Sequence, residues 1–269
     1  MINFSNLLIT RKITTAVVIL AATGSAGAED SRISGFFAAG VAATPDFEGS
    51  SNYQAVPYIT SHLHAGRLNF EFEGLTARLH FKLPSWFEAG LSLNYRFGRD
   101  DDINNTVVGR LREIDDTLEA GGFFRIKLDD QSQQRDSLEF QIEAFGDTDS
   151  VHHGNNATLS AAYSFFPGQR WRYESSAETT YADGDYMDTY FSVDTDNAAL
   201  SGLPHFNANG GFKDFGLNLN VTHFFSDKLG ILGRVAYNHL IGDAAHSPIV
   251  GEQGASEQLF GGLSVLYRF

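Results

Sequence analysis

The stretch FEAGLSLNYRF, residues 87–97, alternates apolar and polar side chains from end to end. Its odd-numbered positions are all apolar, and its even-numbered positions are Glu88, Gly90, Ser92, Asn94 and Arg96. A two-residue period is typical of a β-strand with one apolar and one polar face. A soluble β-sandwich and a membrane barrel both contain such strands, so the rest of the chain has to decide between them.

The same alternation recurs along the chain. It is clear in 212–225 and appears, with local lapses, at 33–43, 53–64, 67–73, 75–82, 117–128, 137–146, 156–166, 171–181, 229–241 and 257–269. These segments predict about twelve strands, several of them near the length of about ten residues that a tilted strand needs to cross a bilayer. Ten or fourteen strands stay open, because 182–211 is long enough to contain another hairpin around Tyr186 to Val193.

The connections between these strands are of two kinds. Those after even-numbered strands are mostly short, at 64–67, 83–86, 129–136, 167–170 and 226–228. Those after odd-numbered strands include long polar loops, at 98–116, 146–155, 182–211 and 242–256, although the connection at Gly74 is tight. Short turns on one side and long loops on the other are typical of an outer-membrane barrel. The fold expected is an all-β, transmembrane, up-and-down antiparallel barrel with short periplasmic turns and long extracellular loops.

Charged residues of both signs stand on the polar faces of several strands. A barrel in lipid directs its apolar face outward, so these residues are expected in the lumen. The lumen charges predicted are Arg78, Lys82, Arg96, Glu119, Arg125, Glu139, Glu143, Arg172, Glu174 and Glu178. They would either fill the lumen as an ion-pair lattice or line a narrow channel, and the filled version is favoured.

The two ends of the chain carry targeting signals. Residues 1–28 combine Arg11 and Lys12 with an apolar core at 13–22 and the small-residue ending Ala26-Gly27-Ala28, which predicts a secretory signal peptide. The mature barrel is then 29–269, exported to the outer membrane of a Gram-negative cell and built without cysteine.

The carboxyl end contains Leu263, Val265, Tyr267 and Phe269 at a spacing of two. This pattern resembles the signal that the barrel-assembly machinery recognises. Aromatic residues near strand ends are expected in the interfacial girdles, namely Trp86, Tyr95, Phe97, Phe165, Phe166, Trp171, Tyr237 and Phe269.

The formal charge of −14 disfavours nucleic acid as a partner, because a phosphate backbone requires clustered Lys and Arg. Outer-membrane lipid and lipopolysaccharide are the expected surroundings, and the acidic loops at 100–102 and 194–196 suggest bridging through divalent ions as a hypothesis. The pair His152-His153 has flanking carboxylates, but consecutive loop residues do not preset a metal site. We therefore predict neither a resident metal nor a cofactor.

The candidate residues for a catalytic triad are Asp243, His246 and Ser247, which lie in one segment. Some outer-membrane barrels are lipid-acting hydrolases, and these need a nucleophile, a base and a carboxylate in hydrogen-bond geometry. Neighbouring residues of one loop rarely meet that geometry, so turn formation by Asp243, Ser247 and Pro248 is the preferred interpretation. No catalytic residue is predicted, and a hydrolase is the least favoured alternative.

Three stretches resemble the MipA/OmpV family of outer-membrane proteins. They are GDAAHSPIV at 242–250, with Gly251, Gln253, Gln258 and the terminal YRF, PDFEGSSNYQAVPY at 45–58, and TYFSVDTDNAALSGLPHF at 189–206. The last departs from the usual pattern at Ser192, where Gly is usual, and at Asp194, where Ser is usual. The resemblance covers essentially the whole mature chain.

The resemblance implies a non-enzymatic scaffold that interacts with a lytic transglycosylase and a peptidoglycan synthase, or a surface adhesin or antigen. None of these roles follows from the residues themselves. A narrow diffusion channel for small solutes is the alternative, and the two readings differ in whether water can pass through the lumen.

Overall fold

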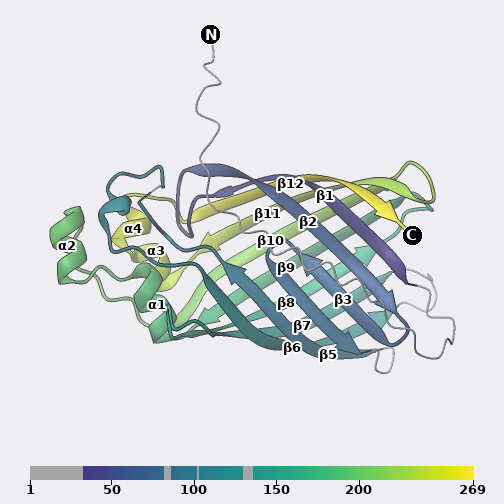
Figure 1. Ribbon diagram of the computed structural model, residues 1–269, viewed down its shortest axis with the longest axis horizontal. Helices are drawn as coiled ribbons and strands as arrows, with labels where there is room; N and C mark the ends of the chain where they lie inside the picture. Colours follow the sequence, from purple (N-terminus) through teal and green to yellow (C-terminus); the bar gives the residue numbers. More distant parts are fainter. Residues whose placement is uncertain (1–32, 82–85, 102, 130–135) are drawn as a thin grey trace, which may run out of the picture. The chain divides into compact units, whose positions relative to one another are not determined.

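The computed structural model describes residues 33–81, 86–101, 103–129 and 136–269. The predicted signal peptide and the predicted lumen residue Lys82 lie outside the described residues. Twelve strands form one closed barrel in which each strand pairs antiparallel with its sequence neighbours, and β1 pairs with β12 (Figure 1). This confirms the predicted up-and-down barrel.

The strands alternate in direction around the barrel, and their bounds follow the predicted segments closely. They are β1 (Ser34–Pro45), β2 (Tyr53–Ala65), β3 (Leu68–Glu73), β4 (Thr76–Phe81), β5 (Phe87–Arg96), β6 (Thr117–Asp129), β7 (Ser137–Asp147), β8 (Asn155–Phe165), β9 (Trp171–Ala182), β10 (Gly211–Phe224), β11 (Leu229–Leu240) and β12 (Glu257–Arg268).

The long connections gather at one end of the barrel and contain its helices (Figure 1). These are η1 (Val108–Arg110), α1 (Gly184–Phe191), α2 (Thr195–Ser201), α3 (Gly242–His246) and α4 (Pro248–Gly251). The carboxyl terminus lies at the opposite end, with the short turns. The predicted loop asymmetry is confirmed, and 183–210 forms α1 and α2 rather than an extra hairpin. Among the described residues no helix is both long and apolar enough to cross a bilayer.

Local sequence explains why α1 and α2 begin where they do. The side chains of Asp183 and Asp194 accept hydrogen bonds from the backbone N–H groups of Tyr186 and Asn197, which caps both helices at the amino end. Gly202 ends α2 in the left-handed conformation, with φ of 80°.

The exterior of the barrel is apolar and much of its interior is polar. Leu91, Val41 and Val265 are 70%, 67% and 67% exposed, whereas Glu119 is fully buried and His80 is 2% exposed. This arrangement is inverted relative to a soluble sandwich and suits a barrel whose outer face contacts lipid.

One wall of the lumen departs from the polar expectation. The inward faces of β11, β12 and β1 carry Leu232, Leu266 and Ala38, which form an apolar cluster with partly buried Phe36 and Phe224. The charged lumen residues therefore come chiefly from β3 to β9, although Arg234 of β11 also contributes.

The barrel closes where the ends of β1 and β12 meet. Gly35 N–H donates to the Phe269 carbonyl and Phe269 N–H donates to the Gly35 carbonyl, at 3.2 and 3.1 Å. Gly35 has φ of +150°, and a Cβ there would lie 1.9 Å from the carbonyl oxygen of His62. Only glycine fits this close approach of two strands.

The β3–β4 hairpin is shorter than its neighbours, which explains the tight connection at Gly74. Strand β2 pairs with β3 only over residues 60–65, so the segment 53–59 pairs with β1 alone. Pro57 falls in this segment, where a missing N–H breaks no ladder bond with β3.

Candidate functional site: the capped lumen

A small hydrophobic core closes the long-loop end of the barrel. Tyr186, Met187, Tyr190 and Phe191 of α1 are buried there together with Leu240 at the end of β11. A second cluster, with Val193, Val108 and Ile249 among its members, joins the loops that contain α2, η1 and α4. We call this assembly of 46–52, 97–101, 103–116, 183–210 and 241–256 the cap.

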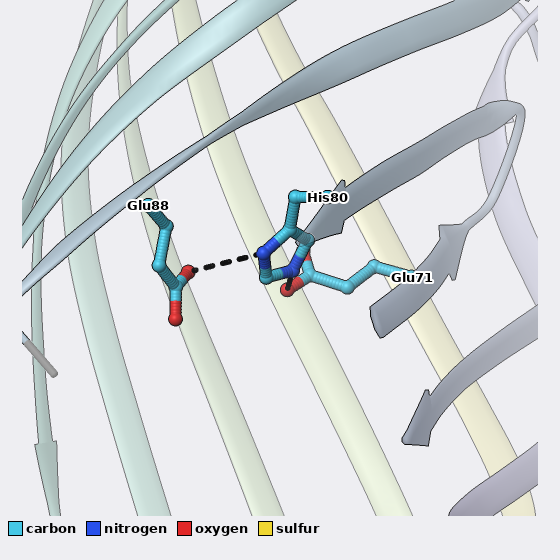
Figure 2. Close-up of side chains that lie close together, drawn as sticks. All are labelled: Glu71, His80 and Glu88. Carbon is cyan, nitrogen blue, oxygen red and sulfur yellow. Dashed lines mark hydrogen bonds and ion pairs between the residues drawn. The ribbon is translucent and has the colours of Figure 1, made fainter. Parts of the chain in front are cut away.

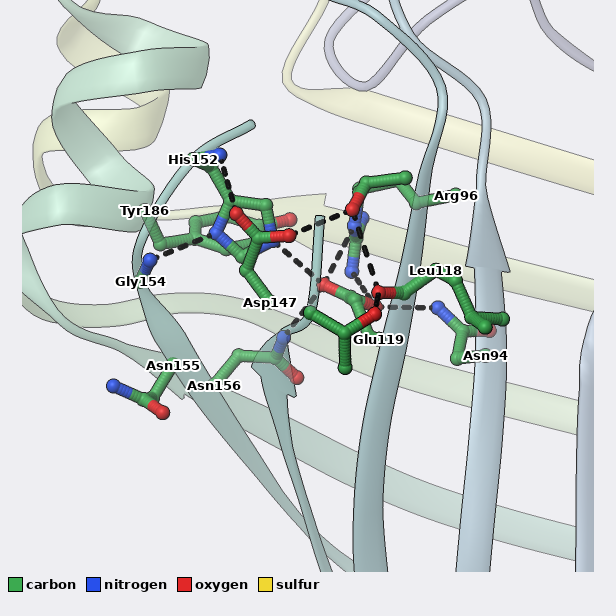
Figure 3. A network of polar contacts seen from close by, with 12 residues as sticks. Asn94, Arg96, Leu118, Glu119, Asp147, His152, Gly154, Asn155, Asn156 and Tyr186 are labelled. Atoms are coloured by element: carbon green, nitrogen blue, oxygen red, sulfur yellow. Dashed lines mark hydrogen bonds and ion pairs between the residues drawn. The ribbon is translucent and has the colours of Figure 1, made fainter. Parts of the chain in front are cut away.

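A buried polar cluster lies directly beneath α1, at the mouth of the lumen (Figure 3). Its centre is Glu119, which is 0% exposed. The Arg96 guanidinium lies 3.1 Å from Glu119 Oε1, and Asn94 Nδ2 donates to Oε2 at 2.6 Å. His152 Nε2 and Asn156 Nδ2 each lie 3.2 Å from Oε1. Five side chains from β5, β6, β8 and the 148–154 loop therefore contact one another on the inner face of the barrel, below the cap.

Tyr186 joins the cap to this cluster. Its ring is fully buried, with the Arg96 guanidinium 5.0 Å from the ring centroid, and its hydroxyl donates to Glu48 Oε2 at 2.9 Å. Burial raises the pKa of Tyr186 well above its ordinary value. Glu48 also contacts the Lys213 ammonium. Burial alone would raise the pKa of Glu48, but Lys213 and Arg96 together hold that pKa below its ordinary value.

Glu48 and Lys213 were not predicted as site residues. Glu48 lies in the 45–58 stretch that resembles the family, and this resemblance was the only sequence feature that pointed to it. Lys213 occupies an odd position that simple alternation directs outward, toward lipid. A register shift between Phe212 and Asp214 turns Lys213 inward, where it is 6% exposed. Such a bulge adds one residue and cannot be read from the periodicity.

The 242–250 stretch acts as a buried anchor of the cap. Ser247 is 0% exposed, donates its hydroxyl to the Phe191 carbonyl at 2.6 Å and caps α4. The Asp243 carboxylate accepts from both the backbone and the side-chain amide of Asn209, and these hydrogen bonds lower the pKa of Asp243. Within the described part of the chain no hydrogen bond joins the side chains of Asp243, His246 and Ser247 into a triad.

The histidine pair 152–153 is held by hydrogen bonds within its own loop. Asp147 Oδ2 accepts from the backbone N–H groups of His152 and His153 at 2.7 and 2.8 Å. The His152 ring contacts Glu119 through Nε2, and Gly154 N–H donates to its Nδ1 at 3.1 Å. Both ring nitrogens of His152 therefore already have protein partners.

Two further ion-pair groups fill the middle of the lumen. Arg78 holds Glu143 with two parallel contacts, Nε to Oε1 at 2.7 Å and Nη2 to Oε2 at 2.6 Å. Arg234 on β11 contacts Glu73 on β3, four strands away around the barrel, and Glu73 also lies 3.8 Å from Arg78. These contacts join strands that are not neighbours in the barrel wall.

The second group surrounds Arg125. Figure 2 shows Glu71, His80 and Glu88, whose ligand-type atoms lie within 4.8 Å of one another. Arg125 Nη1 lies 2.9 Å from Glu71 Oε1 and 2.8 Å from Glu88 Oε2. The guanidinium thus bridges the two carboxylates, and a metal ion held by the same atoms would have to displace it.

The remaining predicted lumen residues also face inward. Glu139 contacts Lys127 at 3.0 Å, and Arg172 contacts Glu174 at 2.8 Å. Glu178 lines a cavity of about 230 Å³ beneath the cap, together with Arg96 and Lys213.

At the carboxyl end the outward side chains Leu263, Val265 and Tyr267 are 56%, 67% and 44% exposed, and Phe269 is 44% exposed. Phe166, expected in a girdle, instead lines the lumen at the short-turn end, because it lies beyond the last paired residue of β8.

A closed barrel with an apolar exterior, an ion-paired interior and a helical cap over one end defines an outer-membrane-type β-barrel. Residues 37–269 match the family described as MltA-interacting protein MipA, and the chain belongs to that family. The resemblance seen in the sequence is thereby confirmed. No curated protein matches the sequence.

Solved structures that are similar to the chain include three outer-membrane proteins. OmpT of Vibrio cholerae is 8% identical with a TM-score of 0.40, covering 88% of this chain and 97% of that one. An outer-membrane channel of Pseudomonas putida F1 is 12% identical with a TM-score of 0.40, covering 91% and 98%. The channel DcaP of Acinetobacter baumannii is 8% identical with a TM-score of 0.39, covering 89% and 97%.

Proposed function

We propose that the protein is a non-enzymatic barrel of the outer membrane that works through its surfaces, as a scaffold for the cell-envelope machinery. The observation that carries this proposal is the burial of Tyr186 between the cap and the mouth cluster. Its side chain has no exposed surface, donates to Glu48 and packs on Arg96, and these contacts support a cap that closes the lumen at α1. A barrel closed in this way has its outer surface and its two ends available for work.

The proposed partners are enzymes of the peptidoglycan layer, a lytic transglycosylase and a peptidoglycan synthase. The description of the family, as proteins that interact with MltA, supports a partner of this kind. The short-turn end would face the periplasm, so a partner of that layer would dock there.

Single-channel conductance of the refolded mature protein in planar bilayers tests the closed lumen. Ala182 and Gly211 are register partners, so deleting 184–209 leaves Asp183-Gly210 as a two-residue turn between them. Asp-Gly is favoured in hairpin turns of this length, which keeps the barrel intact. We expect silence from the intact protein and conductance from the deletion variant. Leu200→Ser, at an exposed position of α2, is the matched control and should stay silent.

Steady conductance of the intact protein would overturn the closed-barrel proposal and favour a narrow diffusion channel. That second candidate has one observation in its favour, since the lumen holds separate cavities of about 360 and 230 Å³. The scaffold role is tested by cross-linking in cells, with the host's lytic transglycosylase as the expected partner of the full-length chain.

A further inference from the structure

The short-turn end of the lumen contains a cavity of about 360 Å³ that the proposed scaffold role does not use. We call it the rim pocket. Its lining includes Phe36, His62, Arg172, Phe224, Leu266 and Arg268. It also includes residues at the ends of β1 and β12, so it reaches the short-turn edge of the barrel. Its volume falls in the lower part of the range of roughly 300–1,000 Å³ found for small-molecule sites.

One side of the rim pocket is apolar. Leu266 and Leu232 point inward from β12 and β11, and they belong to the apolar cluster that Phe36 and Phe224 join. Phe36 stacks on the His62 ring with centroids 5.1 Å apart. Apolar side chains form no hydrogen bonds with water, so a cavity that they line binds an apolar group more favourably than water. An apolar wall in the lumen therefore points to an apolar group as its occupant.

The other feature of the rim pocket is a cation without a carboxylate. The Arg268 guanidinium lies 3.9 Å from the Phe224 ring centroid, and no carboxylate of the described residues forms an ion pair with it. Glu174 is paired with Arg172, and Glu73 with Arg234. At the chain end, the Phe269 carbonyl accepts from Gly35 N–H. Arg268 thus keeps its side-chain donors available at the rim.

The geometry points to a binding site for a small anionic amphiphile, a carboxylate that bears a short apolar chain. The chain would lie against Leu232 and Leu266, and the carboxylate would accept hydrogen bonds from Arg268, which lies opposite Phe36 across the β1–β12 pair. A guanidinium suits a carboxylate because its donors match the two oxygens. Entry would be from the short-turn side, so the site operates whether or not the cap opens.

Methyl NMR of leucine-labelled protein in lipid nanodiscs, titrated with octanoate, tests this site. The inward methyls of Leu232 and Leu266 report on the pocket, whereas the outward Leu259 and Leu263 report on partition into lipid. Leu→Ile variants assign the four signals. We expect saturable shifts at the inward pair. Shifts confined to the outward pair, or shifts that do not saturate, would overturn the proposal.

Two variants separate the parts of the site. Arg268→Gln should weaken octanoate binding about tenfold, which is about 1.4 kcal/mol, because it removes a charge-assisted hydrogen bond. Leu266→Trp should fill the pocket and abolish binding, and Val265→Trp, outward on the same strand, is its matched control. Because Arg268→Gln changes only an exposed rim residue, it decides the question if Leu266→Trp does not fold. Equal binding of octanoate and octylammonium would show that Arg268 does not select an anion and would overturn the proposed ligand class.

Discussion

The Tyr186 hydroxyl donates to the Glu48 carboxylate at 2.9 Å, joining two loops that lie 138 residues apart in the chain. Tyr186 comes from the β9–β10 loop and Glu48 from the β1–β2 loop, which leave the barrel at well-separated strands. Lys213 of β10 contacts the same carboxylate. One partly buried carboxylate therefore fastens α1 over the mouth of the barrel.

Substitution of Tyr186 should open the cap without unfolding the barrel. Tyr186→Phe loses one hydrogen bond to a charged group, about 1.5–3 kcal/mol, while Glu48 keeps Lys213. Tyr186→Ala also leaves a cavity, and large-to-small changes of buried aromatic residues cost about 3–5 kcal/mol. Hydrogen exchange of the amides of 184–191 should rise from the parent to Phe to Ala.

Conductance in the same series gives an independent measurement. We expect brief openings for Tyr186→Ala and a silent Tyr186→Phe. Equal exchange protection in all three proteins would show that the cap is held mainly by its apolar contacts.

Acid should open the cap through Glu48. Its pKa in the folded protein lies below the ordinary value of 4.5, so its contribution to cap stability is fully present above that value. That contribution is lost as the pH falls through the lowered pKa, when a neutral carboxyl faces Lys213 and Arg96. Asp183 acts in the same direction, because its pKa is also lowered.

We therefore expect no change in exchange of the α1 amides between pH 7 and about pH 5.5, and faster exchange relative to the intrinsic rate below about pH 4. Glu48→Gln should be less protected at pH 7 and should lose most of this dependence. A profile identical in Glu48→Gln and the parent would assign the acid effect to other carboxylates.

The two-residue period was sufficient to predict the barrel wall, but it did not predict the cap. Each outward position in β5 or β12 must meet lipid, so alternation fixes which way a side chain points, and the twelve predicted strands were confirmed. The cap depends on tertiary packing of short helices whose buried residues follow no long period. For this reason the sequence was also compatible with a hairpin around Tyr186.

Two particular residues show why the inner surface was harder. Lys213 points inward only because a bulge shifts the register beside Phe212. Leu266 stands at an inward position where a polar residue was expected, and it forms the wall of the rim pocket. Alternation alone predicts neither the position of a bulge nor an apolar residue on the inward face.

The Arg78–Glu143 pair should show strong coupling in a double-mutant cycle. Glu143 is 5% exposed, so removing either partner leaves a poorly solvated charge, which costs about 3–5 kcal/mol in buried pairs. Arg78→Met with Glu143→Leu should cost less than the sum of the two single changes. Urea unfolding in lipid vesicles measures this, and additive costs would mean that lumen water already screens the pair.

The terminal aromatic residue should matter for assembly in cells more than for stability. Phe269 is 44% exposed at the barrel edge, and its ring stacks on that of Tyr267 with centroids 6.2 Å apart. Phe269→Ser should lower the amount of folded protein in the outer membrane while leaving spontaneous refolding into vesicles nearly unchanged. Leu259→Ser, outward on the same strand and 52% exposed, is the matched control. Equal losses in both variants, in cells and in vesicles, would mean that Phe269 acts only as a lipid-facing side chain and not as an assembly signal.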